Sequence, residues 1–449
     1  MAAAPQRDGM SPSDGTSAAT EQPRQRRLPR LSAPPALRYA AYRNFWLGSL
    51  AAVGGFQVLQ FGQLWLIHEL TGSPIYLGYV GLANAVPAIV LNLAGGVVAD
   101  RFDRRRLIIA TQTITAALIV VLATLTAAGV VQVWHILAIA AVTGAVNAFN
   151  TPARMALFPH LIERPALMSA VALNSSIWQG TRIVAPAIAG VLVALFGTAT
   201  AFYVAAAGNL TMAIVVVFLK VPAVKGGRST NALLDLAEGL RFIGRNSIFS
   251  FLIGMTFFNS FFGMAYIMLM PVFAVDVLGV GAEGQGVMMS AGGIGSLLVT
   301  LWLGTRRNVK GKGFILIGGA IMTGLSLAAF ALTSKYIGSL PLAVALLFFV
   351  GVFTSTYMIS IMSSLQMLVP DNMRGRVMGF YGMTWNIMPL GGMQAGALAG
   401  FVGAPLAVAI GGLIVTAFAV GPALLNRQVR TLGALLDHAE RRGAPQPAS

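Results

Sequence analysis

The chain of 449 residues contains no cysteine, only four histidines and few charged side chains. The absence of cysteine excludes disulfides and thiolate metal sites. No two histidines have a helical spacing suited to a shared metal ion. Charged residues make up 10% of the chain, whereas soluble domains carry about a quarter. With 56% hydrophobic residues and a mean hydropathy of +0.76, the composition indicates a membrane protein.

Motifs for chemistry are also missing. The sequence has no Walker-type glycine-rich loop, no catalytic triad and no metal-ligand spacing. We therefore expect no enzyme, no cofactor and no ATP-driven pump.

Long apolar runs fill most of the chain. A helix needs about 20 apolar residues to cross the hydrocarbon core. Twelve segments qualify, some with interruptions: 45–70, 75–99, 107–128, 134–159, 167–196, 199–220, 248–276, 284–304, 313–333, 340–368, 377–402 and 405–426.

The polar stretches between these runs divide the chain into parts. We predict a disordered cytoplasmic tail over 1–43, a six-helix half over 44–220 and a second half over 248–426. The linker over 221–247 contains an amphipathic helix, Ala232–Phe242, suited to the membrane surface. A basic cytoplasmic tail follows over 427–449. The first tail has no apolar run, so it is not a signal peptide.

Basic residues are strongly asymmetric about these segments. With the N-terminus inside, the inner loops and both tails collect the arginines and lysines, whereas the outer loops together hold only Lys335. This predicts a multi-pass protein of the cell membrane with both termini in the cytoplasm. The distribution also explains the net charge of +16 without nucleic acid as a partner.

The loop after the second segment carries a motif. Residues 100–106 hold six charges in seven positions, directly after Gly96 and before the next apolar run. This loop resembles the loop between helices 2 and 3 of the major facilitator superfamily. Gly96, Asp100, Arg101, Arg104 and Arg105 match that pattern, while Asp103 stands where the pattern has glycine. Glycine tolerates positive φ more readily than aspartate does, so this departure could change the turn.

The resemblance implies an all-α membrane protein of twelve transmembrane helices in two pseudo-symmetric six-helix halves. An internal repeat agrees with it. At an offset of 207 residues, four pairs fall at equivalent points of the two halves: Glu69 with Asp276, Gly72 with Gly279, Gly144 with Gly351 and Trp178 with Trp385.

The same resemblance implies that helices 1, 4, 7 and 10 line a central cavity, with substrate bound between the halves. Polar side chains inside a bilayer are costly unless they face water or a partner. They share faces of several predicted helices, and the alternative is hydrogen bonding between helices. As the substrate cavity we predict Gln57, Gln60, Asn147, Asn150, Arg154, Ser175, Gln179, Arg182, Asn259 and Tyr266.

Arg182 is the most informative of these residues. It lies roughly 22 Å into the fifth segment, and no acidic residue lies in the middle of any predicted segment. It either binds an anionic substrate group or bonds carbonyls freed by Pro186. Residues 182–190 resemble part of the helix-5 signature of superfamily antiporters, with Ala185 and Ala189 replacing two glycines.

Two mechanical roles follow from the sequence. The resemblance implies that Asp100 meets the positive N-terminal end of helix 11, near Arg376–Gly379, and closes the cytoplasmic side. The alternative is a charge cluster that only fixes orientation.

Proton coupling needs a titratable group, and the only acids associated with the helices are Glu69 and Asp276, at outer ends. Either one is a candidate proton carrier, although exposed acids at a helix end are ordinary.

Residues 69–73 and 368–376 resemble the branch of enterobactin exporters and macrolide efflux proteins. We therefore expect a monomeric efflux transporter for a siderophore-like or drug-like small molecule, working by alternating access and linked to a proton or another ion. An uptake permease for a small nutrient shares this fold and is the main alternative. A non-transporting membrane sensor is the other.

Overall fold

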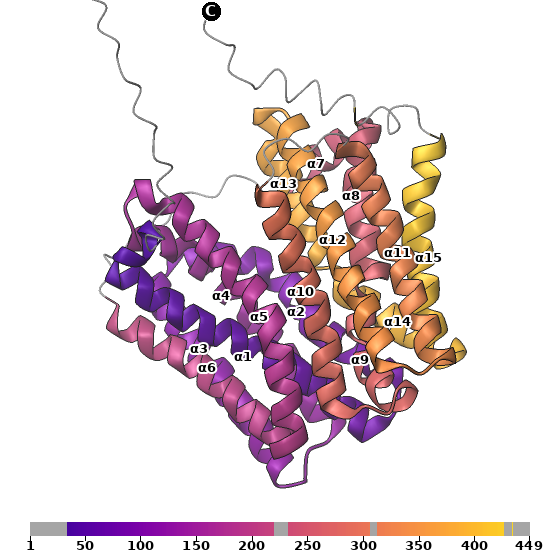
Figure 1. Ribbon diagram of the computed structural model, residues 1–449. Coiled ribbons are helices and arrows are strands. Elements are labelled where there is room, and N and C mark those ends of the chain that lie inside the picture. The colour runs from indigo at the N-terminus through magenta and orange to yellow at the C-terminus, as the bar shows by residue number, and fades with distance from the viewer. Residues whose placement is uncertain (1–33, 220–231, 306–311, 426–432, 434–449) are drawn as a thin grey trace, which may run out of the picture. The chain divides into compact units, whose positions relative to one another are not determined.

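The computed structural model describes residues 34–219, 232–305, 312–425 and 433. The chain from Pro35 onward forms one compact unit. All regular elements among the described residues are helices (Figure 1). Eleven helical spans there are long and apolar enough to cross a membrane. The prediction of an all-α, multi-pass membrane protein is therefore confirmed.

The first half consists of six long helices. They are α1 (Ala40–Thr71), α2 (Pro74–Arg101), α3 (Arg104–Ala127), α4 (Val133–Leu157), α5 (Leu167–Phe196) and α6 (Thr198–Phe218). Within this half, α1 and α3 pack on α6, and α2 packs on α4.

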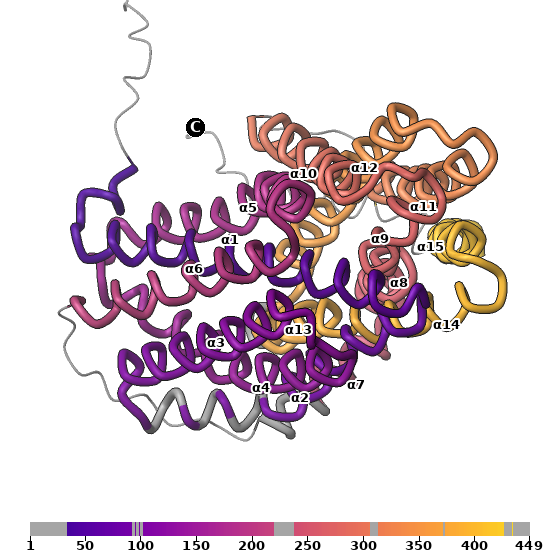
Figure 2. The backbone as a smooth tube through the Cα atoms, turned by 90° about the horizontal axis from the view of Figure 1, so that it is seen from below, coloured from indigo at the N-terminus to yellow at the C-terminus, as the bar shows by residue number. Residues whose placement is uncertain are grey.

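The second half has shorter pieces among its helices. They are α8 (Ser247–Phe258), α9 (Met270–Val272), α10 (Gly281–Thr305), α11 (Lys312–Tyr336), α12 (Leu340–Leu368), α13 (Asp371–Trp385), α14 (Met388–Val402) and α15 (Ala404–Leu425). Here α10 and α11 pack on α12, and α11 also packs on α15. Figure 2 shows α5 of the first half beside α10 of the second.

Two predicted segments are interrupted. The seventh contains π-helical turns at Asn259–Gly263 and Phe273–Val277 with a 3-10 turn between them. Pro271 has no N–H to donate, and its ring clashes with the carbonyl four residues earlier, so a regular helix does not continue there. The eleventh segment breaks between α13 and α14, at Asn386 and Ile387.

The chain enters α1 at Ala40, five residues before the predicted apolar segment. The reason is tertiary. The Tyr42 hydroxyl donates a hydrogen bond of 2.8 Å to the Ala170 carbonyl, and the Trp46 indole N–H donates one of 2.9 Å to the Leu173 carbonyl. Both acceptors belong to α5, so the first turns of α1 are held against that helix.

The paired glycines of the repeat have matching conformations. Gly72 and Gly279 both adopt left-handed φ, at 58° and 64°; Gly72 directly follows α1, and Gly279 lies two residues after the second π-helical turn. A Cβ on Gly144 would collide with the Asn84 backbone, and one on Gly351 would collide with the Gly292 backbone. The same close helix contact is therefore present in each half.

The amphipathic linker segment is the helix α7 (Ala232–Arg245). It packs on α13, where Gly239 lies against Phe380 and the Glu238 carboxylate is 2.7 Å from the Arg376 guanidinium. The start of the linker and both predicted tails, apart from a few of their residues, lie outside the described residues.

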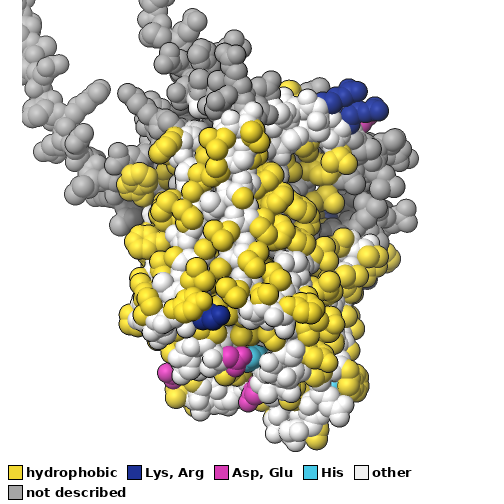
Figure 3. All heavy atoms as spheres, turned by 90° about the vertical axis from the view of Figure 1, so that its right-hand side faces the viewer, with side chains coloured by type: hydrophobic (Ala, Val, Ile, Leu, Met, Phe, Trp, Pro, Cys, Tyr) yellow, Lys and Arg dark blue, Asp and Glu magenta, His cyan; other side chains and the backbone are white. Residues whose placement is uncertain are grey.

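The outer surface is strongly apolar. Phe401 and Leu425 are both 88% exposed. On the face drawn in Figure 3, hydrophobic side chains cover the middle height, and charged side chains lie toward the upper and lower parts. This surface suits a lipid bilayer, because apolar side chains at that depth face hydrocarbon.

Candidate functional site

A cavity of about 470 Å³ lies between the two halves. Its walls come from α1 and α5 on one side, and from the irregular seventh segment, α10, α12 and the α13–α14 break on the other. We call it the central cavity. A volume of this size falls within the range of small-molecule sites, about 300–1,000 Å³.

Six of the ten predicted substrate residues line the central cavity. They are Gln57, Gln60, Gln179, Arg182, Asn259 and Tyr266. Trp178 and Trp385, a pair in the internal repeat, line it as well. The cavity thus combines amides, aromatic rings and methionines with a single cation.

Arg182 provides that cation. Its Nη2 atom lies 3.9 Å from the sulfur of Met264, a weak acceptor. None of the residues lining the central cavity is acidic. Among the described contacts, Arg182 bonds to no carbonyl of α5, so the alternative of carbonyls freed by Pro186 finds no support in this conformation. The guanidinium is positioned to meet an anionic or carbonyl group of a ligand.

Two buried amides at the central cavity keep unpaired atoms. Asn259 Nδ2, a donor, and Gln285 Oε1, an acceptor, have no hydrogen-bond partner among the described residues. Asn259 lies in the first π-helical turn, an irregularity that is frequent at functional sites. Gln285 was missed from the sequence because a single polar residue near the start of α10 carries no pattern.

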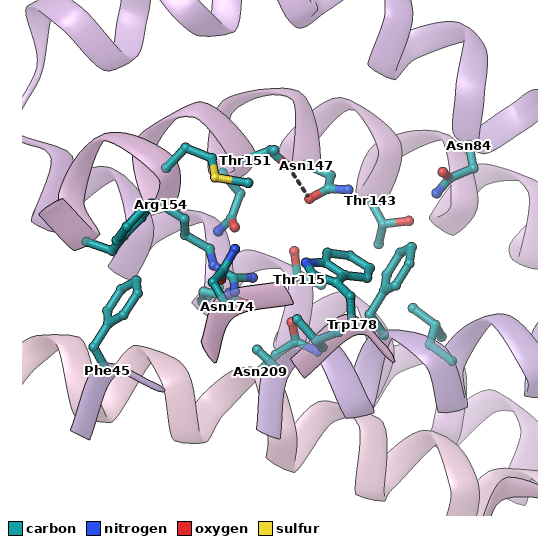
Figure 4. Close-up of a pocket in the computed structure, with 18 residues that line it drawn as sticks. Phe45, Asn84, Thr115, Thr143, Asn147, Thr151, Arg154, Asn174, Trp178 and Asn209 are labelled. Atoms are coloured by element: carbon teal, nitrogen blue, oxygen red, sulfur yellow. Dashed lines mark hydrogen bonds between the residues drawn. The ribbon is translucent and has the colours of Figure 1, made fainter. Parts of the chain in front are cut away.

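A second, smaller pocket lies inside the first half, with a volume of about 130 Å³. The predicted cavity residues Asn147, Asn150 and Arg154 line this pocket and not the central cavity (Figure 4). Trp178 borders both. We call it the N-half pocket. The face of α4 recognised in the sequence therefore borders this pocket, with Asn150 buried and Asn147 exposed.

Ser175 lines neither space. Its side chain is exposed, and its hydroxyl donates a hydrogen bond of 3.1 Å to the Val171 carbonyl one turn earlier on α5.

The halves approach one another closely at one end of the central cavity. A Cβ atom on Gly190 of α5 would lie 2.5 Å from the Ala282 carbonyl oxygen of α10, and the Ser290 hydroxyl donates a 2.6 Å hydrogen bond to the Ile183 carbonyl. On the opposite side of the interface α2 packs on α14, where a Cβ on Gly396 would lie 2.6 Å from the Pro74 carbonyl oxygen. We call this the closed end. Small residues allow such close contact of helix backbones.

A polar contact also joins the halves at the closed end. The Nε2 atom of His68, in the last turn of α1, lies 3.3 Å from Oδ1 of Asp276 in the second π-helical turn. His68 is 5% exposed and Asp276 is 48% exposed. Glu69 points into solvent and has no partner among the described residues. The two predicted proton carriers thus differ, since only Asp276 contacts the other half.

The bases of the predicted cytoplasmic gate bond within their own half. The Arg104 guanidinium donates to the Ala156 carbonyl at 3.1 Å, and Arg105 donates to the carbonyls of Val216 and Val217 at the end of α6. Asp103 has φ −62°, and its carboxylate caps α3 by accepting from the Arg106 N–H at 3.1 Å. Aspartate therefore fits where the family pattern has glycine. The side chains of Asp100 and Arg101 and the surroundings of Gly96 lie outside what the structure describes.

Comparison with known proteins agrees with this architecture. Residues 32–447 match the sequence model of a family described as transmembrane secretion effectors. The chain is 25% identical over 399 residues to the staphyloferrin A transporter of Staphylococcus aureus, covering 86% of this chain and 97% of that protein. It is 25% identical over 295 residues to macrolide efflux protein A of Streptococcus pyogenes, covering 64% and 71%.

A solved structure shares the fold. A bacterial homologue of the human lysosomal transporter Spinster, in an inward-facing and unoccupied conformation, superposes with a TM-score of 0.66 at 15% identity. The match covers 93% of this chain and 100% of that one.

Proposed function

We infer that this chain, which belongs to the transmembrane secretion effector family of the major facilitator superfamily, exports a small organic molecule by alternating access in exchange for protons. The observation that carries this proposal is the central cavity, which lies between two halves that close over it at one end.

Alternating access requires contacts that can form at either end in turn. At the closed end the contacts are between small residues of α5 and α10, and of α2 and α14. At the other end, α13 packs on the linker helix α7, and Arg104 and Arg105 bond to α4 and α6. With the termini in the cytoplasm, this is a conformation open to the cytoplasm. In the opposite state we expect Asp100, beside Gly96 and Arg101, to reach the N-terminal end of α13.

The chemistry of the central cavity suits siderophore-like or drug-like cargo. Arg182 offers a cation, Asn259 and Gln285 offer a free donor and acceptor, and Met264 with Trp385 offers adaptable apolar surface. Relatives described as a staphyloferrin A transporter and a macrolide efflux protein support the same range of cargo, and the second also supports the outward direction.

We assign proton coupling to Asp276 and not to Glu69. Asp276 contacts His68 across the interface, so a change in its protonation alters a contact that holds the closed end. Glu69 has no such contact among the described residues.

Asp276→Asn is expected to abolish gradient-driven accumulation of cargo while leaving cargo binding in detergent unchanged. The carboxamide keeps the size of the side chain and removes the proton carrier and the carboxylate that contacts His68. The measurement is uptake into inverted vesicles with and without an imposed proton gradient. The matched variant Glu69→Gln should keep the gradient response, and the assignment reverses if only Glu69→Gln loses it.

The proposed function is tested by transport in inverted membrane vesicles, with catecholate siderophores, macrolides and lipophilic cations as cargo. Accumulation that depends on the proton gradient is the expected result. Accumulation only in right-side-out vesicles would indicate an uptake permease. Binding without flux in either orientation would indicate a sensor.

A further inference from the structure

The N-half pocket meets the central cavity at Trp178 and is built by all six helices of the first half. It is bordered by residues of the peripheral helices α3 and α6 as well as by α1, α2, α4 and α5. Its polar lining residues are Asn84, Gln112, Thr115, Thr143, Asn147, Asn150, Thr151, Arg154, Asn174 and Asn209, and none of its lining residues is acidic.

Several of these polar groups are already used by the bundle. Asn150 Nδ2 donates to the Thr111 hydroxyl at 2.7 Å, Asn209 Nδ2 donates to the Ala205 carbonyl at 2.9 Å, and Asn84 Nδ2 donates to the Ala140 carbonyl at 3.3 Å. Thr143 donates to the Ile139 carbonyl at 2.8 Å. The bonds of Asn150 and Asn84 join helices, and those of Asn209 and Thr143 stay within α6 and α4, so none of these donors needs a ligand.

Three of the donors that remain belong to α4 and α5. In Figure 4, the side chains of Arg154 and Asn174 point toward one another, with Trp178 beside them. Arg154, Asn174 and the Trp178 indole have no hydrogen-bond or ion-pair partner in the described part of the chain. A half-buried guanidinium with two neutral donors and no carboxylate among the lining residues offers the groups that bind an oxyanion.

Aromatic rings also line the N-half pocket. Phe45, Phe56, Phe158 and Trp178 line it, and the rings of Phe56 and Trp178 pack edge to face with centroids 6.5 Å apart. An inorganic anion would leave this surface without a partner. A ligand that carries an acid group on a small apolar body can bind the donors with its acid group and contact the aromatic rings with its apolar body.

The size of the pocket restricts that body. An apolar cavity of about 150 Å³ holds one benzene molecule, and the N-half pocket measures about 130 Å³. Its interior accommodates one ring or short chain with its acid group.

We propose that the N-half pocket is a second binding site, specific for an oxyanionic group on a small apolar body, with Arg154 and Asn174 as the recognition residues. The site is independent of the cargo bound in the central cavity. Its ligand is either a soluble aromatic or aliphatic acid or the headgroup region of an anionic lipid, which present the same chemistry.

The test uses the full-length protein in detergent with benzoate as the probe and uncharged benzamide as the matched control. Saturation-transfer NMR titration is expected to give saturable binding of benzoate and much weaker binding of benzamide. Arg154→Gln should weaken benzoate binding roughly 10- to 100-fold, and Asn174→Ala roughly 3- to 10-fold. Arg154→Lys should recover part of the affinity, while Arg182→Gln should leave it unchanged. Melting temperatures identify any variant that fails to fold.

Three results would overturn the proposal: equal binding of benzoate and benzamide, benzoate binding that survives both Arg154→Gln and Asn174→Ala, or loss only in Arg182→Gln, which would place the anion in the central cavity. Competition by added lipid distinguishes the two sources of ligand. Displacement of benzoate by phosphatidylglycerol but not by phosphatidylcholine identifies a lipid headgroup. No displacement by either identifies a soluble acid.

Discussion

Arg182→Gln is expected to lower transport by roughly 30-fold or more. Among the described residues, Arg182 is the only charged one that lines the central cavity, and no acidic residue there shares its charge. Truncating one member of a desolvated charge pair costs about 2–5 kcal/mol, and glutamine cannot supply the charge that a bound anionic group requires. The measurement is initial transport rate per unit of protein in the membrane, in vesicles with an imposed proton gradient.

Two further variants sharpen this experiment. Arg182→Lys keeps the charge but loses the planar donors, so it should retain only part of the activity. Ser175→Ala changes a residue of the same helix that lies outside both cavities, and it should transport normally. If Arg182→Gln transports at the wild-type rate at normal abundance, Arg182 does not contact the cargo.

Gly190→Val is expected to stop the closed end from closing. Because a Cβ at this position would lie 2.5 Å from the Ala282 carbonyl oxygen, a valine forces α5 and α10 apart. Overpacking of this kind costs about 1–3 kcal/mol, which shifts the balance between two states by roughly 5- to 150-fold. Transport should fall, and the central cavity should open at that end.

The absence of cysteine makes this opening measurable. A single Gln60→Cys substitution places one thiol in the central cavity, and an impermeant maleimide added from the closed-end side reports access to it. Labelling should rise when Gly190→Val is added. Gly180→Val is the matched control on the same helix, since a Cβ there meets no atom within 4 Å. Unchanged labelling in Gly190→Val, or an equal rise in Gly180→Val, would contradict the predicted role of Gly190.

The membrane class, the two halves and most helix positions were predictable from the sequence. Hydropathy is a local property, and a helix needs a fixed length of apolar chain to cross a bilayer. The paired glycines were also recognised in the sequence, from their common offset of 207 residues. They keep the same position in both halves because close helix contacts leave no room for a side chain at Gly144 or Gly351. The prediction missed the breaks in the seventh and eleventh segments, because apolar composition continues through Pro271 and Asn386.

For the site, the sequence determined by itself which polar residues share a helix face, since that follows from the 3.6-residue period. Gln57, Gln179 and Arg182 were recognised in this way. Only the tertiary structure decided which cavity each helix face lines. It places Arg154 in the N-half pocket and brings His68 against Asp276 from the other half. The physical reason is that helical periodicity orients a side chain about its own axis, whereas its partners depend on how that helix packs against helices distant in the sequence.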